Sequence, residues 1–542
     1  MQSLKKLLNI GNLYMFFYMF CTFKRSKFIG QLHWIILLPL SIICTILFCL
    51  LLIILAIYYE IINFVLNLKH GDDYCGIMDG SDVIWVVEEE TFSLIKMLFM
   101  VDAKDGEGCE PLFEFVKRTY EKIAKTHNKM SCVRRYFMGY VYFLKTQINI
   151  HEHVKYLEDY KDVEGFNLLM DKLSDSPLPA GNTALWEVYV GRVPLKWENN
   201  GGKVQYPILM KYHHSIGDGM SLITLITTNL INNGVNSMKE NCKNYSNILK
   251  KSDLNNSKPT FLENVKKLFY KSYYISYFGP LDDSDENILH EKHLSHQKHV
   301  CYSLEKETTN YVEKVKSIKN RIKGISFNDV ILSAFSASCA DYCMSLDENP
   351  PENIRFALPY YIASTNFNSL VTTGINGEIV TNLKNNFTLG VQNIPIKDKD
   401  IARNMVDRLM CINQNSQTSK DSLDFLFNNW QMNVCASIAP FFVIEKMAKL
   451  NHNTVVLTNF PGIQSFNLAS GHRIRDIVAW APHFLKCGIT CTIFSHDGFF
   501  RFGLIVDKEI IKKRSEVQEI CDNIFKYIDL LDTMTRTAYD EN

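Results

Sequence analysis

The chain has 542 residues, of which 47% are hydrophobic and 12% aromatic, and its 58 basic and 58 acidic side chains balance. This length predicts two large lobes plus a membrane segment, and the balanced charge removes the broad electrostatic argument for a nucleic-acid partner. The fifteen Cys include no Cys-x-x-Cys pair, so we expect structural thiols and no metal site.

The N-terminal segment is the first element along the chain. Residues 28–59 hold no charged side chain and are rich in Ile and Leu, which is enough to cross a bilayer core of about 30 Å once. We therefore expect residues 1–70 to form a membrane-anchoring region with its main span at about residues 31–58. Pro39 would either kink this helix or mark its start. The more polar residues 8–23 either lie in the interface or form a marginal first span.

The most informative pattern is the run H-H-S-I-G-D-G at residues 213–219, which has the form H-H-x-x-x-D-G of an acyl-transfer motif. Residues 184–190 and 206–212 before it have the composition of strands. Residues 222–230 after it repeat Leu and Ile at helical spacing. The sequence therefore places the motif on a strand-to-helix turn.

A second helix is predicted at residues 326–334, where a Ser or Asn cap precedes a buried face. Together with the motif, this region belongs to a series of blocks that resembles the wax ester synthase/diacylglycerol acyltransferase family, within the wider group of CoA-dependent acyltransferases. The blocks follow the family's order and extend over about residues 76–530. They are MDGSDVIW at 78–85, ALWE at 184–187, NDVIL at 328–332, TNFPG at 458–462 and SHDG at 495–498.

The resemblance implies an α/β fold of two similar CoA-dependent-acyltransferase-like lobes. Each lobe would be a mixed sheet flanked by helices, and the two would be joined by a crossover and enclose a tunnel at their interface. On this basis residues 71–300 form the N-terminal lobe with the motif, and residues 301–542 form the C-terminal lobe. One departure is that the Arg usual in the family after a Pro-Val strand has no counterpart near residues 358–362, which puts its role in doubt.

The chemistry of the motif can be argued from residue type. Transfer of an acyl group from a thioester to a hydroxyl requires a base for the hydroxyl proton, and an imidazole suits this task. We assign His214 as the general base, with His213 orienting the turn. The motif has no G-x-S-x-G nucleophile elbow, and no covalent acyl-enzyme is required.

The remaining motif residues support the turn. Asp218 could polarise the base, but a structural role, capping the next helix or pairing with an Arg, is favoured. Gly217 and Gly219 suit unusual backbone angles and a close approach of substrate.

Outside the motif, Asn459 is either an oxyanion donor or site-shaping residue, or a turn residue before Pro461 and Gly462. Asn328 and Asp329 are expected to cap and lock a helix. Surface or packing roles are expected for the three histidines of the C-terminal part, His472, His483 and His496.

These residues predict an acyl-CoA-dependent O-acyltransferase that binds no cofactor and uses acyl-CoA as the donor substrate. A membrane anchor beside the lobes favours a lipid alcohol as acceptor, either diacylglycerol or a long-chain alcohol, giving triacylglycerol or wax ester. Two alternatives stay open: a catalytically silent lipid-binding or scaffold protein, and acyl transfer to a small soluble alcohol or amine.

The expected location is an integral protein of the endoplasmic reticulum or plasma membrane, and protein partners are not predicted. Lys24, Arg25 and Lys27 precede the span and Asp72 and Asp73 follow it, which places the N-terminal flank in the cytosol and the lobes across the membrane. An enzyme that uses acyl-CoA would more simply face the cytosol. The orientation is therefore left open.

Overall fold

The computed structural model describes residues 34–540 except for short gaps and one long one. The gaps are 89, 180–182, 198–202, 241, 244–286, 291–292, 307, 347–349, 362–366, 375–376, 398–400, 402–403, 422–423, 449–452, 461, 463, 465 and 486. Residues 8–23, for which an interfacial or spanning role was predicted, and Pro461 lie outside the described residues.

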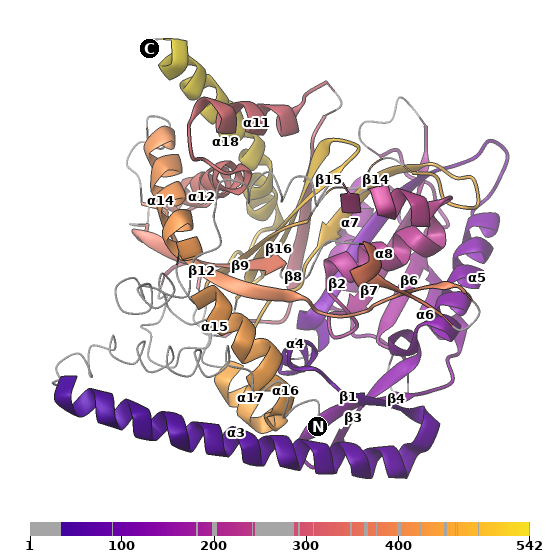
Figure 1. Cartoon of the computed structure of the whole chain (residues 1–542). Coiled ribbons are helices and arrows are strands. Elements are labelled where there is room, and N and C mark those ends of the chain that lie inside the picture. Colours follow the sequence, from indigo (N-terminus) through magenta and orange to yellow (C-terminus); the bar gives the residue numbers. More distant parts are fainter. Residues whose placement is uncertain are drawn as a thin grey trace.

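The body is an α/β structure built on two mixed sheets (Figure 1). One sheet has five strands in the order β14-β2-β7-β6-β5, and the other has six in the order β12-β9-β13-β15-β16-β8. The strands of the first are β2 Leu94–Asp102, β5 Val154–Tyr156, β6 Trp186–Val190, β7 Gln205–His213 and β14 Ile474–Trp480. Those of the second are β8 Lys298–Leu304, β9 Asn353–Tyr361, β12 Phe387–Pro395, β13 Val455–Asn459, β15 Ile489–His496 and β16 Phe499–Asp507. This confirms the expected α/β class.

Strand β14 links the two halves of the chain. It comes from the C-terminal part but pairs antiparallel with β2, with Ile477 opposite Phe99. It also passes close to β16, because a Cβ added to Gly503 would lie 2.3 Å from the carbonyl oxygen of Ala479. The first sheet is therefore completed by an edge strand from the C-terminal part of the chain.

Helices cover both faces of the first sheet, and the strand residues alternate accordingly. On β2, Met97 and Phe99 join one apolar core while Leu98 and Met100 join another, as expected for a strand whose successive side chains point to opposite faces. The first core contains residues of α5 Glu110–Thr126 and α8 Gly219–Leu230, and the second contains residues of α7 Val163–Asp175. A strand buried on both faces reads as a nearly continuous apolar run, as β2 does.

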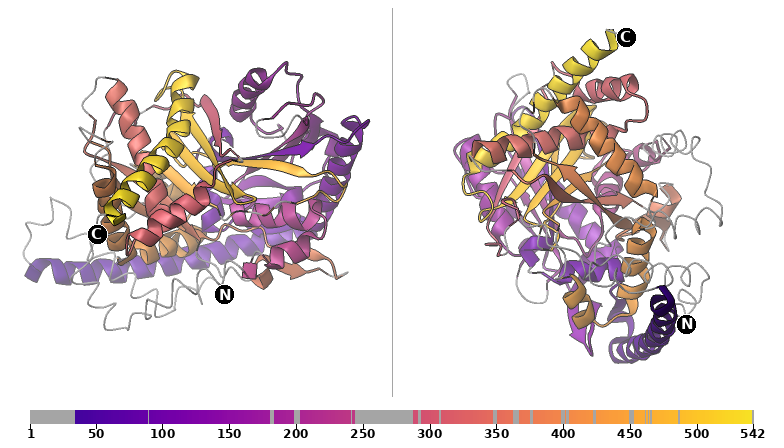
Figure 2. Two further views of the ribbon diagram at one scale, coloured as in Figure 1. Left: turned by 90° about the horizontal axis from the view of Figure 1, so that it is seen from above. Right: turned by 90° about the vertical axis from the view of Figure 1, so that its left-hand side faces the viewer.

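The second sheet carries a layer of longer helices on one side (Figure 2). Its core unites strand residues with α11 Tyr311–Arg321, α12 Phe327–Ser345, α14 Met405–Asp421 and α18 Arg514–Asp540. Helix α12 begins with a capping box, in which Ser326 and Asp329 bond each other's backbone N–H. The helix predicted at residues 326–334 is thus confirmed, and so are the strands and the helix predicted around residues 213–219.

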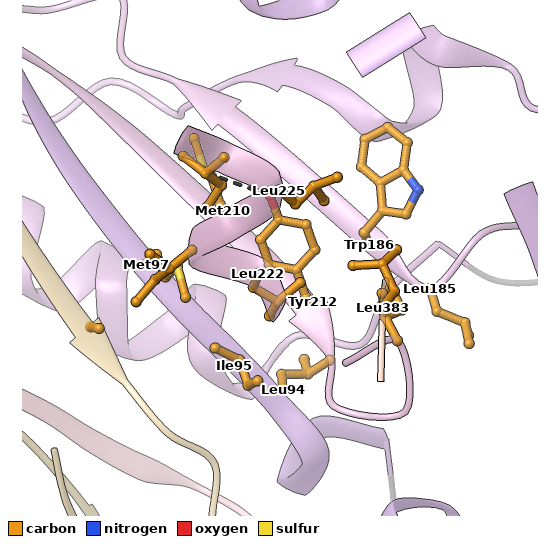
Figure 3. Close-up of a cluster of buried hydrophobic side chains, with 14 of the residues drawn as sticks. Leu94, Ile95, Met97, Leu185, Trp186, Met210, Tyr212, Leu222, Leu225 and Leu383 are labelled. Carbon is orange, nitrogen blue, oxygen red and sulfur yellow. Dashed lines mark hydrogen bonds between the residues drawn. The ribbon is translucent and has the colours of Figure 1, made fainter. Parts of the chain in front are cut away.

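The residues under this turn form a compact apolar cluster (Figure 3). Tyr212 and Met210 on β7 face Leu222 and Leu225 of α8, and Trp186 on β6 lies beside them. All five side chains are fully buried. Because closely packed cores resist displacement, this cluster fixes where β7 ends and α8 begins.

The smaller elements lie at the periphery. One sheet of three strands has the order β1-β4-β3, with β1 Tyr74–Ile77, β3 Cys132–Phe137 and β4 Tyr140–Lys145, and another pairs β10 Val371–Thr373 with β11 Ile379–Thr381. The short helical segments are α4 Gly80–Val83, α6 Ile150–His153, α13 Phe367–Leu370, α15 Asp424–Trp430, α16 Ala436–Ile438, α17 Phe441–Ala448 and the single turns η1 Gly71–Asp73, η2 Ile84–Val86, η3 Glu90–Ser93, η4 Asn128–Ser131 and η5 Gln431–Cys435.

The N-terminal helix α3, Trp34–His70, runs along the outside of the body (Figure 1). It begins before Pro39 and continues twelve residues past the predicted end of the span at residue 58, so Pro39 does not mark its start. Leu52, Ala56, Ile62 and Leu66 are buried, the last two against Tyr140 and Tyr142 of β4. Within the described residues, the segment Ile46–Asp73 is the one helix long and apolar enough to cross a membrane.

Candidate functional site

The turn between β7 and α8 is held by backbone hydrogen bonds. The N–H of His214 donates to the carbonyl oxygen of Ser93 at 2.8 Å. Its own carbonyl oxygen accepts from the Asn385 side chain at 2.8 Å. Both backbone polar groups of His214 are therefore fixed, and only its imidazole is available for chemistry.

The His214 ring lies in an aromatic pocket. It stacks on Trp85 of η2 with ring centroids 3.7 Å apart and an interplanar angle of 11°, and Phe387 meets it edge-on at 5.8 Å. The side chain is buried, and its Nδ1 has no hydrogen-bond partner among the described residues. Burial disfavours the charged imidazolium and lowers the pKa of His214 to about 3, against smaller opposing effects of its own backbone and of the Asn385 side chain. The ring is consequently neutral at pH 7 and able to accept a proton.

His213 has a different environment. Its Nε2 lies 2.8 Å from a guanidinium nitrogen of Arg134, and its Nδ1 lies 2.8 Å from the Ser215 hydroxyl. Because a guanidinium only donates, Nε2 must accept from Arg134, while Nδ1 contacts both the hydroxyl and, at 3.2 Å, the backbone N–H of Ser215. Burial and the charge of Arg134 lower the pKa of His213. His213 is thus a neutral side chain with both ring nitrogens engaged, as the predicted role in orienting the turn requires.

Arg134 also contacts Glu90, and these two side chains line a surface pocket next to His213. Arg134 donates to Glu90 at 2.9 Å, and both residues line a pocket of about 290 Å³. The guanidinium therefore joins His213 to a solvent-accessible part of the surface.

A charged network supports the turn from below. The buried carboxylate of Asp82, in α4, accepts from Lys129 Nζ at 2.5 Å and from Asn385 Nδ2 at 2.8 Å. Lys129 also donates to the Ser215 carbonyl oxygen at 3.3 Å. Burial raises the pKa of Asp82, and the neighbouring charge of Lys129 opposes this. Through Lys129 and Asn385, one carboxylate fixes the carbonyl groups of Ser215 and His214.

Asp218 caps α8. One carboxylate oxygen accepts from the Ser221 N–H at 2.9 Å, the geometry of an N-cap. The other accepts from the Asn386 N–H at 2.8 Å. Burial raises the pKa of Asp218, while these two hydrogen bonds oppose the shift. Both oxygens are committed to backbone groups, which confirms the capping role among the alternatives predicted for Asp218.

The two glycines of the turn are needed for space. Neither Gly217 nor Gly219 has a positive φ, so the prediction of unusual backbone angles is wrong. A Cβ on Gly219 would lie 2.0 Å from the Phe460 ring, and one on Gly217 would lie 3.0 Å from Ser221. Gly219 therefore makes room for the Phe460 side chain of the block at 458–462, so the group that comes close to this glycine belongs to the protein and not to a substrate.

The Asn459 side chain belongs to a separate cluster at the end of β13. Asn459 is exposed and its amide donates to the Asn328 side chain at 2.8 Å. Both residues line a cavity of about 60 Å³, together with Asp329. Asp329 is buried and accepts from Ser326 N–H at 2.8 Å.

Two more donors complete the Asp329 environment, Ser416 Oγ at 2.7 Å and Asn413 Nδ2 at 2.9 Å. Every contact of this carboxylate joins one end of α12 to its surroundings. The structure therefore brings Asn328, Asp329 and Asn459 together, but in the second sheet and apart from the His214 contacts.

The C-terminal block nevertheless approaches the turn, because Phe460, next to Asn459, is the residue that packs on Gly219. A Cβ on Gly462 would lie 1.9 Å from Ser495 Oγ, so Gly462 packs the block onto β15. The histidines His472, His483 and His496 are all buried. For these three, the packing alternative holds and the surface alternative is wrong.

Three residues around His214 were not assigned a role from the sequence: Trp85, Asp82 and Asn385. Trp85 and Asp82 fall in the block at 78–85, which marked the resemblance but carried no chemical signal of its own. Asn385 lies 171 residues from His214, and its sequence neighbourhood contains no motif. The spatial contacts alone identify it.

Comparison with known proteins finds relatives for the C-terminal part of the chain. The model of the WS/DGAT C-terminal domain matches residues 383–531, a segment that includes Asn385, Phe387 and Asn459. The wax ester synthase/diacylglycerol acyltransferase 3 of Arabidopsis thaliana is 27% identical over 125 residues, or 22% of this chain. The match spans only about a quarter, 24%, of the length of this Arabidopsis protein.

Solved structures extend the likeness to most of the chain. The wax ester synthase/diacylglycerol acyltransferase of Marinobacter aquaeolei superposes with a TM-score of 0.54 at 14% identity, covering 85% of this chain and 100% of that one. Residues 383–531 are therefore similar to the C-terminal domain of the wax ester synthase/diacylglycerol acyltransferases, and most of the chain shares their fold. The fold of the family is shared more widely: the trichothecene 15-O-acetyltransferase of Fusarium sporotrichioides superposes with a TM-score of 0.53 at 10% identity, covering 84% and 94%.

Proposed function

We propose that the protein is a membrane-bound O-acyltransferase that moves a long-chain acyl group from acyl-CoA to a lipid alcohol. The acceptor would be diacylglycerol or a long-chain alcohol, and the product triacylglycerol or wax ester. The observation that carries the proposal is the neutral, buried imidazole of His214, whose backbone is fixed and whose Nδ1 has no partner in the described part of the chain. A buried polar atom without a partner is costly in a folded protein and is expected to meet a ligand group.

The chemistry follows from this geometry. As the hydroxyl oxygen of the acceptor attacks the thioester carbonyl carbon, a nitrogen of His214 takes the hydroxyl proton. The tetrahedral intermediate then collapses, the carbon–sulfur bond breaks, and the imidazolium returns the proton to the sulfur of the leaving CoA. The proton of the hydroxyl thus ends on the CoA thiol, and the enzyme returns to its starting state. His213, Asp82, Lys129 and Asn385 act by holding the turn in place.

The test compares membranes that contain the wild-type protein, His214→Ala, and His151→Ala, which removes an exposed histidine of α6. Each is incubated with labelled palmitoyl-CoA and either hexadecanol or diacylglycerol, and the neutral lipids are separated. We expect His214→Ala to lower the rate about 10²- to 10⁴-fold and His151→Ala to leave it unchanged. The labelled product names the acceptor.

Other outcomes distinguish the alternatives. A folded wild-type protein that binds lipid but forms no ester would support the lipid-binding or scaffold function. Labelled product that stays in the aqueous phase after extraction would support transfer to a small soluble alcohol or amine. Equal activity of wild type and His214→Ala would refute the assignment of the base.

We propose that α3 anchors the protein in an endoplasmic reticulum or plasma membrane. A 37-residue helix is about 55 Å long, which exceeds the bilayer core of about 30 Å. Leu52 is the first buried side chain among the described residues of α3, and the helix before it is about 27 Å long, so a crossing would also use residues beyond Leu52. Beyond Leu52, the side of α3 that faces away from the body still exposes Ile54 and Phe64, each by 62%.

The membrane proposal can be tested without disturbing the body. In a double variant with Leu47→Arg and Ile54→Arg, which are 60% and 62% exposed, the membrane-bound fraction should fall several-fold, since each Arg opposes burial in lipid by about 2.5–3.5 kcal/mol at the bilayer centre. Leu168→Arg alters an equally exposed Leu, 58%, on α7, and should stay membrane-bound. An unchanged bound fraction in the double variant would contradict the proposed anchor.

We further propose that residues 71–300 and 301–542 are the two lobes and that donor and acceptor reach His214 through a tunnel between them. The contact of Phe460 with Gly219 supports a site shared by both halves. Asn385 and Phe387, which contact His214 from the C-terminal half, support it as well.

A further inference from the structure

Trp85 presents an unused hydrogen-bond donor beside His214. Its side chain is only 6% exposed, and its Nε1 has no partner among the described residues. The surrounding rings, Phe387 and Phe484, are apolar and offer no acceptor atom. Since a buried indole N–H normally finds a partner, the position of this donor needs an explanation.

The base and this donor are direct neighbours. Trp85 stacks on His214, and neither Trp85 Nε1 nor His214 Nδ1 has a hydrogen-bond partner in the described part of the chain. One donor and one imidazole are therefore unused beside each other, as recognition of a polar ligand group requires.

We infer that the indole N–H of Trp85 donates a hydrogen bond to the carbonyl oxygen of the acyl donor while His214 takes the proton of the attacking hydroxyl. This inference rests on the proposed acyl transfer and adds a catalytic residue to it. The thioester oxygen is the better partner, because it gains negative charge as the tetrahedral intermediate forms. A donor on the hydroxyl oxygen would instead occupy the electron pair that attacks.

The geometry supports this division of labour. The indole and imidazole rings are nearly parallel at 3.7 Å, so the Trp85 N–H lies at the edge of the same stack as the base. The carbonyl oxygen and the attacking hydroxyl are attached to, or approach, the same carbon. A base and an oxyanion donor that act on one carbon must lie side by side, as these two rings do.

The sharpest variant is Trp85→Phe, which keeps an aromatic ring on His214 and removes the N–H. Trp480→Phe is the matched control, because Trp480 is equally buried but donates to the Cys301 carbonyl oxygen at 2.8 Å. We expect Trp85→Phe to lower kcat about 10²-fold, the usual effect of losing one oxyanion donor, with KM changed by less than about threefold because the donor strengthens in the transition state. Trp480→Phe should lower the melting temperature and leave kcat nearly unchanged.

A second readout does not depend on turnover. The full-length protein, with ¹⁵N-labelled tryptophan in detergent micelles, is mixed with an unreactive palmitoyl-CoA analogue that has a methylene between the sulfur and the carbonyl. The indole N–H resonance that is missing in Trp85→Phe should move downfield and exchange more slowly with solvent.

The outcomes separate the two proposals. A shifted Trp85 resonance without turnover in the wild-type protein would support the contact and refute the acyl transfer. Turnover that Trp85→Phe leaves intact, or an analogue that binds without moving the resonance, would overturn the role of Trp85 and leave the acyl transfer standing. A wild-type protein that neither binds the analogue nor turns over acyl-CoA would refute both.

Discussion

The His214 turn and the Asp329 cluster are both built from sequence blocks of the family, but they satisfy their polar groups differently. The Asp329 cluster, which comprises Ser326, Asp329, Asn413 and Ser416, gives its buried carboxylate three donors within 3.0 Å. At the His214 turn, the backbone is fully bonded while Nδ1 of His214 and Nε1 of Trp85 have no partner in the described residues. The first arrangement locks a helix, and the second leaves a donor and an imidazole nitrogen available for the reactant that we propose.

This difference shows how the two kinds of buried polar group can be told apart. A group that serves stability is expensive to leave unpaired, so the fold supplies its partners. A group that serves chemistry must be free to bind the substrate, and the fold supports it through neighbouring backbone atoms instead. Asp82 illustrates the second strategy, since it is linked to the His214 carbonyl oxygen through Asn385 and to the Ser215 carbonyl oxygen through Lys129.

The largest effect on stability is expected from a substitution of Asp329. Asp329→Ala leaves Ser416, Asn413 and the Ser326 N–H without their acceptor, and hydrogen bonds to a charged group are each worth about 1.5–3 kcal/mol. We expect the free energy of unfolding to fall by about 2–4 kcal/mol in chemical denaturation, with kcat of the remaining folded protein within about threefold of wild type. A fall in kcat at unchanged stability would mean that the cluster takes part in chemistry.

Gly219 tests the contact between the two regions. In Gly219→Ala the new Cβ would lie 2.0 Å from the Phe460 ring, and overpacking of this kind costs about 1–3 kcal/mol. Phe460→Leu in the same chain should restore part of the lost stability, as measured by a double-mutant cycle. Gly108→Ala, where a Cβ meets no atom within 4 Å, is the control and should be close to neutral. Additive effects of the two substitutions would contradict the contact.

The sequence predicted the local parts of both regions and missed the long-range ones. The strand, turn and helix at β7 and α8 follow from periodicity and from the motif, and the cap of α12 follows from Ser326 and Asp329. All of these depend on residues within a few positions of each other.

Asn385 could not be found in this way, because its contacts with His214 and Asp82 close loops of 171 and 303 residues. The reason for Gly219 was also out of reach, since the ring that needs its space belongs to Phe460. The extension of α3 to His70 has the same origin, because its last turns are packed on β4 through Ile62 and Leu66. Tertiary packing decided each of these features, and a local pattern does not contain it.

Asn459 offers a smaller effect that decides between its two predicted roles. Its amide is already engaged with Asn328, so we expect Asn459→Ala to lower kcat by less than about threefold in the acyl-transfer assay. An oxyanion donor would instead cost about 10²-fold. The comparison with Trp85→Phe under the same conditions is direct, because each variant removes one side-chain N–H donor.

The smallest expected effect is the response of the reaction to pH. Burial lowers the pKa of His214 to about 3, against about 6.5 in an unfolded chain, so the base of the free enzyme stays neutral throughout the range from pH 6 to 8. We expect kcat/KM to change by less than about twofold across that range, with no inflection near pH 6.5. The same pKa shift should, however, make the folding stability depend on pH. The unfolded chain binds a proton at His214 between about pH 6.5 and pH 3 and the folded one does not, so this contribution to stability is complete above pH 6.5 and is lost as the pH falls through that window. A kcat/KM profile that declines below pH 6.5 while the protein stays folded would contradict this expectation. It would show that His214 is solvated before the reaction, with water bound to the unpartnered atoms around it until substrate arrives.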